Sequence, residues 1–226
     1  MPTPRRSQDE PARTPRRSQD ERARATRAAL TTAAHMLFTE RGYQNVPAEE
    51  IAHAAGVTRG ALYHHYRDKQ DLFRDVFEQL AVEMMDEVSA VARTAPDPLT
   101  GLESALVRSL EFCERPDVVR IALVDAPAVF GWQEWRAIEA RHGLGLITAA
   151  LDHAMRDGLL VPVPVRPLGQ LLLAITIEAA LMIAYAEDRQ VAMAEARKTL
   201  HALLAGLTVT AVPAPGECTP RELRHG

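Results

Sequence analysis

The sequence has 226 residues, 47% of them hydrophobic and 25% charged, which is typical of a soluble globular protein with a sizeable core. Its net charge of -4 is unevenly divided, because residues 1–75 carry +3 and residues 76–226 carry -7. This uneven charge distribution indicates that only the N-terminal part of the protein binds a polyanion. Cys113 and Cys218 lie far apart without metal-ligand spacing, which argues against a disulfide scaffold or a zinc site and favours a reducing cytoplasm.

The chain opens with a duplicated polar segment. TPRRSQDEPAR at residues 3–13 is followed by TPRRSQDERAR at residues 14–24. Without a large apolar side chain such a segment cannot offset its ordering entropy, so we predict a disordered, Arg-bearing arm over residues 1–22. The arm could touch DNA phosphates, but its composition favours a solvated tail.

Helical periodicity begins near residue 21 and predicts three short helices followed by a long one. Gly42 and Gly56 mark the ends of the first two helices, and the hydroxyl of Thr58 can cap the third. The predicted ranges are 21–41, 47–55, 58–66 and 68–93.

The rest of the chain also has helical periodicity and no sustained strand alternation. DAPAVFGW at residues 125–132 is predicted to form a turn, and VPVPVRP at residues 161–167 an extended connector that cannot be helical. The proline-containing tail, residues 211–226, is expected to be flexible. Further helices are predicted over residues 99–114, 116–124, 133–156, 167–187 and 189–207.

The stretch VTRGALYHHYRDK, residues 57–69, has a composition that a buried helix does not need. Three short helices with a Gly-containing turn predict a helix-turn-helix, whose third helix enters the DNA major groove. Gly60 would let the backbone approach DNA, Thr58 can bind a phosphate, and Arg59 can reach a base edge or a phosphate. Leu62 and Tyr66 would face the core. The predicted DNA-contacting residues are Thr58, Arg59, Gly60, Tyr63, His64 and Lys69, the last three pointing outward to grip the backbone.

IAHAAGVTRGALYHHYRDKQDLF, residues 51–73, resembles the DNA-binding signature of the TetR family of bacterial one-component transcriptional regulators, and AAHMLFTERGY, residues 33–43, resembles the family's first helix. The resemblance implies DNA contacts for the same six residues. It also implies an all-α protein in which a three-helix DNA-binding domain, residues 23–83, is joined to a larger helical ligand-binding and dimerisation domain, residues 84–210. In the family, the last two helices form the dimer interface.

LLLAITIEAALMIAYA, residues 171–186, is apolar nearly all round, so that a second buried face implies a partner chain. The predicted dimer-interface residues are Ala179, Tyr185, Leu200, Leu203, Leu204 and Leu207. The candidate ligand-binding residues are Phe130, Trp132, Trp135, Glu178 and Met182. Aromatic and Met side chains at helical spacing are more often simply core, however, and Glu178 could instead pair with Arg189 or Lys198.

These patterns predict a sequence-specific transcriptional regulator in the cytoplasm, a ligand-released repressor that binds a palindromic operator as a homodimer. Its expected partners are double-stranded operator DNA, a second copy of the chain and a small-molecule inducer. No membrane partner is expected, because the longest apolar run falls short of about 20 residues and contains Glu178.

The alternative is a small-molecule-binding protein or enzyme with a structural N-terminal helical module. We expect no enzyme, since neither His142 nor Cys113 has a Ser, Asp or Asn at a recognisable catalytic spacing. We also expect no cofactor and no metal. The adjacent His64 and His65 point about 100 degrees apart on a helix, and no third ligand is near in sequence.

Overall fold

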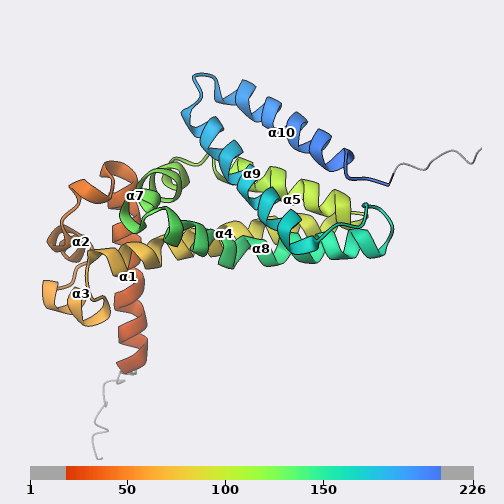
Figure 1. Ribbon diagram of the computed structural model, residues 1–226. Coiled ribbons are helices and arrows are strands. Elements are labelled where there is room, and N and C mark those ends of the chain that lie inside the picture. Colours follow the sequence, from red (N-terminus) through yellow and green to blue (C-terminus); the bar gives the residue numbers. More distant parts are fainter. Residues whose placement is uncertain (1–18, 210–226) are drawn as a thin grey trace, which may run out of the picture. The chain divides into compact units, whose positions relative to one another are not determined.

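The computed structural model describes residues 19–209, nearly all of which belong to helices or to the short turns that join them (Figure 1). The all-α fold class is therefore confirmed. Within this range the β pairing is limited to an isolated antiparallel bridge between Leu160 and Thr208. The chain divides into two compact units, Met1–Val76 and Phe77–Gly226. The predicted domain boundary at residues 83 and 84 falls inside one long helix, α4 (Lys69–Thr94).

Most of the predicted N-terminal arm, residues 1–18, lies outside the described residues, as does the predicted tail. The end of the arm, residues 19–22, was wrongly placed, because helix α1 (Gln19–Arg41) already includes it. Asp20 and Glu21 stand in the first turn of α1, where acidic side chains favour the positive end of the helix dipole. Their charge extends the helix by a few residues beyond its apolar face.

The first unit contains α1, the 3-10 turn Tyr43–Asn45, α2 (Ala48–Ala54), α3 (Arg59–His65) and the start of α4. Gly42 ends α1 with a φ of 77°, a left-handed conformation that is unfavourable for other residues. Helix α2 packs against both α1 and α3. These are the helices that the sequence predicted, with boundaries shifted by a few residues.

Side-chain caps explain where three of the helices begin. Thr58 accepts a hydrogen bond from the backbone N–H of Ala61 at 3.1 Å, which confirms its predicted role as the cap of α3. Asp97 caps α5 (Pro98–Phe112) and Asp188 caps α10 (Arg189–Ala205) in the same way. Each cap satisfies backbone donors that the first turn of a helix leaves unpaired.

Helix α3 is attached to the first unit mainly by Leu62 and Tyr66, which are both buried as predicted. The hydroxyl of Tyr66 donates a hydrogen bond to Asp75 at 2.5 Å, and Arg27 of α1 pairs with the same carboxylate at 3.0 Å. Burial, followed by this hydrogen bond to Asp75, raises the pKa of Tyr66. The phenol therefore remains a hydrogen-bond donor that ties the end of α3 to α4.

The second unit contains the remainder of α4 and the helices that follow it. Helix α8 packs against α5 and α9, and α9 packs against α10, which runs back alongside it (Figure 1). The bounds are α5 (Pro98–Phe112), α6 (Pro116–Val118), a π-helical turn (Val119–Asp125), α7 (Ala126–Phe130), α8 (Trp132–Arg156), α9 (Val165–Tyr185) and α10 (Arg189–Ala205).

Two predicted breaks in the second unit are wrong. Residues 126–130 form α7 and not a turn, because Pro127 occupies the first helical turn, where its missing N–H is not needed. Residues 165–167 are the first turn of α9 and not part of an extended connector, since Pro167 stands in an equally tolerant position. In both cases the proline begins a helix.

Helix α9 is long and apolar enough to cross a membrane by length and composition alone. A single helix of this kind is weak evidence for a membrane span, because the core helix of a soluble protein has the same character. In the second unit α9 packs against α5, α8 and α10. Its apolar composition is accounted for by this packing and by one exposed face, described below.

Candidate nucleic-acid interface and ligand pocket

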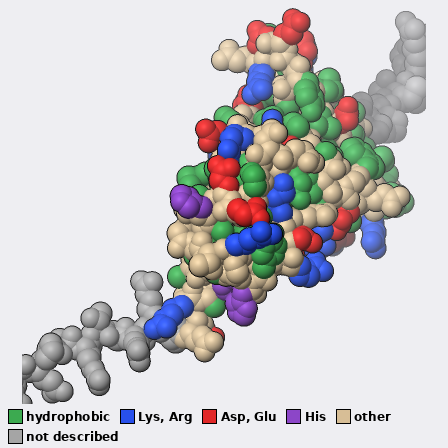
Figure 2. Space-filling view, turned by 90° about the vertical axis from the view of Figure 1, so that its left-hand side faces the viewer, with side chains coloured by type: hydrophobic (Ala, Val, Ile, Leu, Met, Phe, Trp, Pro, Cys, Tyr) green, Lys and Arg blue, Asp and Glu red, His purple; other side chains and the backbone are tan. Residues whose placement is uncertain are grey.

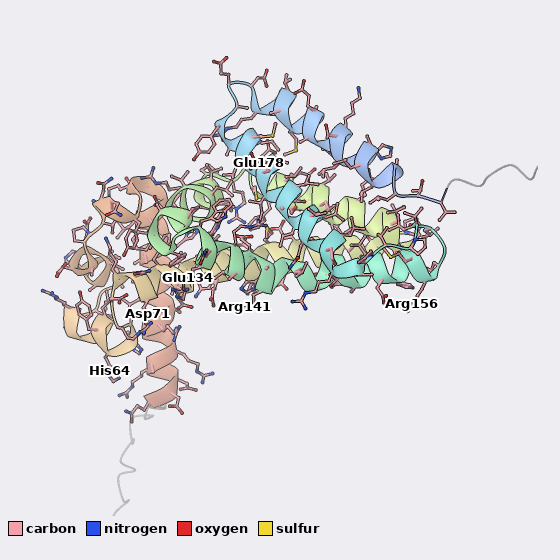
Figure 3. All side chains as sticks on the ribbon, in the orientation of Figure 1. His64, Asp71, Glu134, Arg141, Arg156 and Glu178 are labelled. Atoms are coloured by element: carbon pink, nitrogen blue, oxygen red, sulfur yellow. The ribbon has the colours of Figure 1, made fainter. Side chains whose placement is uncertain are left out.

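The N-terminal end of α3 exposes Thr58, Arg59 and Gly60. A side chain added at Gly60 would meet only the Thr58 hydroxyl oxygen, at 3.8 Å, so the backbone is open to close approach there. Tyr63 and His64 are also exposed, and Figure 3 shows His64 on α3. Five of the six predicted DNA-contacting residues therefore lie on the accessible surface of this helix.

Arg59 is engaged within the first unit. Its guanidinium forms an ion pair with Glu49 of α2 at 3.0 Å and lies over the Tyr63 ring, 5.5 Å from the centroid. Both partners of the ion pair are exposed, and exposed pairs of this kind contribute little to stability. A phosphate or a base edge can therefore replace Glu49 without a large loss of stability.

Lys69 does not point outward, so this part of the prediction is wrong. Its ammonium donates to the backbone carbonyl oxygens of Tyr43 at 2.9 Å and Val46 at 3.1 Å, and lies 4.0 Å from the centroid of the Tyr43 ring. Burial lowers the pKa of Lys69. Two of its three N–H groups hold the 3-10 turn against the start of α4, and the third is left for another acceptor.

Replacing Lys69 with Met is expected to destabilise the protein by about 1–3 kcal/mol, because two carbonyl oxygens lose a charged donor. Urea denaturation followed by circular dichroism measures the change. Arg67→Met is the matched control, since Arg67 is highly exposed and makes only a 3.5 Å pair with Asp71. Equal stability of the two variants would contradict the structural role of Lys69.

The charge on the first unit is balanced by neighbouring acids. Arg41 pairs with Glu50 at 2.6 Å, just as Arg59 pairs with Glu49. On the face seen in Figure 2, blue Lys and Arg side chains are interspersed with red Asp and Glu side chains and do not form one continuous basic patch. Any affinity of this unit for DNA must then come from specific side chains more than from a strong overall field.

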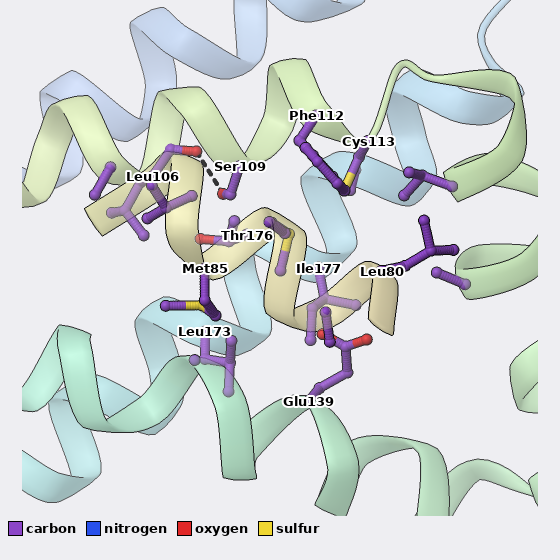
Figure 4. Close-up of a pocket in the computed structure, with 18 of the residues that line it drawn as sticks. Leu80, Met85, Leu106, Ser109, Phe112, Cys113, Glu139, Leu173, Thr176 and Ile177 are labelled. Atoms are coloured by element: carbon purple, nitrogen blue, oxygen red, sulfur yellow. Dashed lines mark hydrogen bonds between the residues drawn. The ribbon is translucent and has the colours of Figure 1, made fainter. Parts of the chain in front are cut away.

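The second unit encloses a largely apolar cavity with about 870 Å³ of space that protein atoms do not fill, part of it open to solvent. Its walls come from α4, α5, α8 and α9 and from the segment between α5 and α7. Residues that line it include Leu80, Met85, Leu106, Phe112, Leu173 and Ile177 (Figure 4).

Only Trp135 among the five predicted ligand-binding residues lines this cavity. Trp132 is 59% exposed and Met182 is 65% exposed, and Glu178 lies exposed on α9 (Figure 3). Phe130 packs beside Phe77, with ring centroids 5.9 Å apart, and does not line the cavity. Glu178 and Met182 were misplaced because periodicity cannot tell which face of the almost wholly apolar helix α9 turns inward.

The polar residues of the cavity were not predicted from the sequence, and Glu139 is the most unusual of them. Burial raises its pKa to about 7, although the charge of Arg136 acts in the opposite direction. Burial, and then the negative charge of Glu139, raises the pKa of the neighbouring Cys113 thiol to about 12. The sequence places Glu139 four residues after Trp135, on the same helix face, but this spacing alone does not distinguish it from an exposed helical acid.

The six predicted dimer-interface residues differ in their exposure. Tyr185 and Leu203 are exposed, but Ala179, Leu200 and Leu204 are buried inside their own subunit and cannot form a surface. The exposed apolar side chains of α9 and α10 are instead Leu171, Met182, Tyr185, Val191 and Leu203. Leu207, two residues after the end of α10, is half-buried, and its carbonyl oxygen accepts a hydrogen bond from the backbone N–H of Val161.

The first unit has three helices, of which the third is short, capped and exposed, and the second unit is helical with an apolar cavity. This arrangement defines the class of helix-turn-helix regulators with a helical second domain. Models of known protein families match both the N-terminal and the C-terminal part of the chain. Residues 30–76 match the model described as bacterial regulatory proteins, tetR family, and residues 99–207 match the tetracyclin repressor-like C-terminal domain. A TetR-family transcriptional regulator from Pectobacterium atrosepticum is 33% identical with a TM-score of 0.75, over 86% of this chain and 99% of that one. The chain belongs to the TetR family.

Curated relatives match about two fifths to three fifths of this chain. The transcriptional repressor BepR of Brucella suis is 40% identical over 42% of this chain and 47% of its own length. The regulator AcrR of Shigella flexneri is 39% identical over 38% of this chain and 40% of its own length. The Transposon Tn10 TetC protein of Escherichia coli is 27% identical over 58% of this chain and 66% of its own length. The chain thus spans between two fifths and two thirds of these relatives.

Proposed function

We propose that the protein is a transcriptional repressor that binds a palindromic operator as a homodimer and releases it when a small molecule occupies the cavity of the second unit. The observation that carries this proposal is the exposed surface of α3, where Thr58, Arg59 and Tyr63 lie on a helix held in place by buried residues. The similarity to repressors such as BepR supports repression of transcription over activation. Since the relatives are named as regulators, we place the protein in the cytoplasm.

Each exposed residue of α3 has a chemically suitable role toward DNA. The Thr58 oxygen accepts its capping hydrogen bond, so its own proton is available for a phosphate. Arg59 can exchange Glu49 for a base edge or a phosphate, and Tyr63 and His64 can donate to the backbone. Lys69 can contribute its third N–H to a phosphate while keeping its two internal bonds.

The proposal is tested by sequencing the DNA that the purified chain selects from a pool of genomic fragments. We expect a palindrome whose half-site centres lie a helical turn or more apart, because a two-fold symmetric dimer reads both halves alike. Affinity for this site should fall steeply with salt, since phosphate contacts release counterions. Absence of any selected sequence would contradict the proposal.

Replacing Arg59 with Ala is expected to weaken binding to the selected operator by about 1–3 kcal/mol if the side chain reads a base. Binding to non-specific DNA should change less. Glu49→Gln is the informative control, because it removes the acid that competes with DNA for Arg59 and should leave operator affinity unchanged or higher. Fluorescence anisotropy at two salt concentrations measures both variants. If the Arg59→Ala variant binds the operator as tightly as the parent, the Arg59 side chain does not contact the DNA.

Helix α4 offers a route for ligand control. It is one continuous helix whose first residues belong to the first unit and whose later residues, Leu80, Met84 and Met85, line the cavity of the second. A ligand that binds better when this wall is displaced would shift the population toward a conformation with different operator affinity. The ligand need not contact the DNA-binding unit itself.

An enzymatic function has less support. Cys113 is buried and its raised pKa keeps the sulfur as a thiol, whereas a nucleophilic cysteine needs a lowered pKa. In the part of the chain that the structure describes, no group of three His, Cys, Asp or Glu side chains is arranged to hold a metal ion. We therefore assign binding and not catalysis to the cavity.

A further inference from the structure

The second unit has a groove in addition to the apolar cavity, where the end of α4, the start of α5 and the second half of α8 meet. The groove contains about 790 Å³ of space that protein atoms do not fill, part of it open to solvent. Leu102, Ala105 and Leu146 line both the groove and the cavity, so they form a common wall between the two.

The apolar lining of the groove consists mainly of small side chains, including Ala92, Ala105 and Ala149. Helices α4 and α5 are in close contact beneath it, because a side chain added at Gly101 would meet the carbonyl oxygen of Ala92 at 3.0 Å. Small side chains on closely packed helices leave room for the apolar body of a ligand, and a few polar groups then fix its orientation.

Three side chains supply the polar groups of the groove, and none of them is acidic. Ser89 and Arg93 are four residues apart on α4 and share one helix face, whereas His153 comes from α8. Among the described residues that line the groove there is no Asp or Glu. The groove is therefore basic, in contrast to the cavity, whose charged lining residue is Glu139.

These side chains have unused hydrogen-bonding capacity. In the part of the chain that the structure describes, Arg93 has no ion pair and no side-chain hydrogen bond. The Ser89 hydroxyl, within the same range, donates to no carbonyl group, whereas that of Ser109 donates to the preceding turn of its helix. His153 lies 3.6 Å from Asp157, and both side chains of this pair are well exposed.

Two acids that are close in sequence to the lining residues have other partners. Asp97 accepts hydrogen bonds from backbone N–H groups as the cap of α5, and Asp152 pairs with Arg156 at 2.6 Å. Their negative charges are therefore partly compensated, and the guanidinium of Arg93 is available to a ligand.

We propose that the groove is a second binding site, separate from the cavity, for a small molecule with an apolar body and one carboxylate group. The body lies on the small side chains and on the common wall, and the carboxylate accepts hydrogen bonds from Arg93 and Ser89, with His153 as a further donor. A guanidinium matches a carboxylate well, because two of its N–H groups can donate in parallel. This inference goes beyond the proposed function and does not depend on it.

The compound 4-phenylbutyrate tests the site, and 4-phenylbutanol is its uncharged counterpart. Binding of each to the full chain is measured by titration calorimetry. Arg93→Gln should weaken binding of the acid about fivefold, as expected for a partly exposed charge-assisted contact, and should leave binding of the alcohol unchanged. Arg156→Gln is the matched control, since Arg156 is exposed at the end of α8 and does not line the groove (Figure 3).

A second pair of variants locates the bound acid. Ala149 is exposed on α8 and lines the groove but not the cavity, so Ala149→Phe fills the groove and should weaken binding of the acid about tenfold or more through steric overlap. Ala137→Phe is the control, at an exposed α8 position that lines neither space. No binding of the acid, equal acid affinity of the parent and either Ala149→Phe or Arg93→Gln, or an equal loss for acid and alcohol in Arg93→Gln would each overturn the proposal.

Discussion

Replacing Met182 with Arg is expected to convert the proposed homodimer to a monomer and to abolish high-affinity binding to the proposed operator. Met182 is 65% exposed in the subunit, and on α9 it shares an apolar surface with Leu171 and Tyr185, which are 60% and 70% exposed. An interface that covers this surface would bury the new guanidinium without a partner, which typically costs several kcal/mol. Because one short recognition helix reaches only a few base pairs, a monomer loses one of the two half-sites.

Sedimentation velocity and anisotropy on the selected operator measure the two effects together. Val82→Arg is the matched control, because Val82 is also an exposed apolar residue but lies on α4 and not on α9 or α10. Arg at Ala179 or Leu204 would be a poor test, since these side chains are buried in the subunit and the variant would disrupt its core. A dimeric Met182→Arg protein with normal operator affinity would place the interface elsewhere.

Replacing Glu139 with Gln is expected to stabilise the protein at neutral and alkaline pH but not in acid. The folded-state pKa of about 7 is higher than the ordinary value of 4.5, so the native state binds more protons than the unfolded state between these pH values. Stability of the parent should therefore fall as pH rises through this window, and the variant should lack this loss. The difference is at most about 3 kcal/mol above pH 7, and less to the extent that water in the cavity screens the charge.

Urea denaturation of parent and variant at pH 5, 6, 7 and 8 measures this dependence. Cys113, which directly follows α5, has a pKa raised to about 12 and so remains a thiol throughout this range, and Arg136 on the same helix contributes a nearby positive charge. Glu178→Gln is the matched control, because it removes an exposed carboxylate from the same unit. A constant difference between Glu139→Gln and the parent from pH 5 to pH 8 would contradict the burial of a titrating carboxyl.

The sequence by itself was sufficient for the local structure of the first unit. The cap at Thr58, the left-handed Gly42 and the inward Leu62 and Tyr66 all depend on residues within a few positions of one another. Such short-range signals identify a helix-turn-helix because its helices are short and their ends are strongly marked. The prolines were harder to interpret. The fixed φ of a residue such as Pro127 is compatible both with a break after one helix and with the first turn of the next helix.

Only the tertiary structure decided which side chains face a partner, a ligand or the core. Lys69 was predicted to point outward, but carbonyl groups more than twenty positions earlier in the chain hold its ammonium inside. On α9, Ala179 and Met182 are equally compatible with burial by composition, yet the packing of α8 and α10 buries one and leaves the other exposed. Glu139 resembles any helical acid in sequence, and its unusual pKa arises only when four helices close around it. Helix formation is a local property of the chain. Whether a side chain points to the core, to a pocket or to the surface depends on long-range contacts that periodicity does not encode.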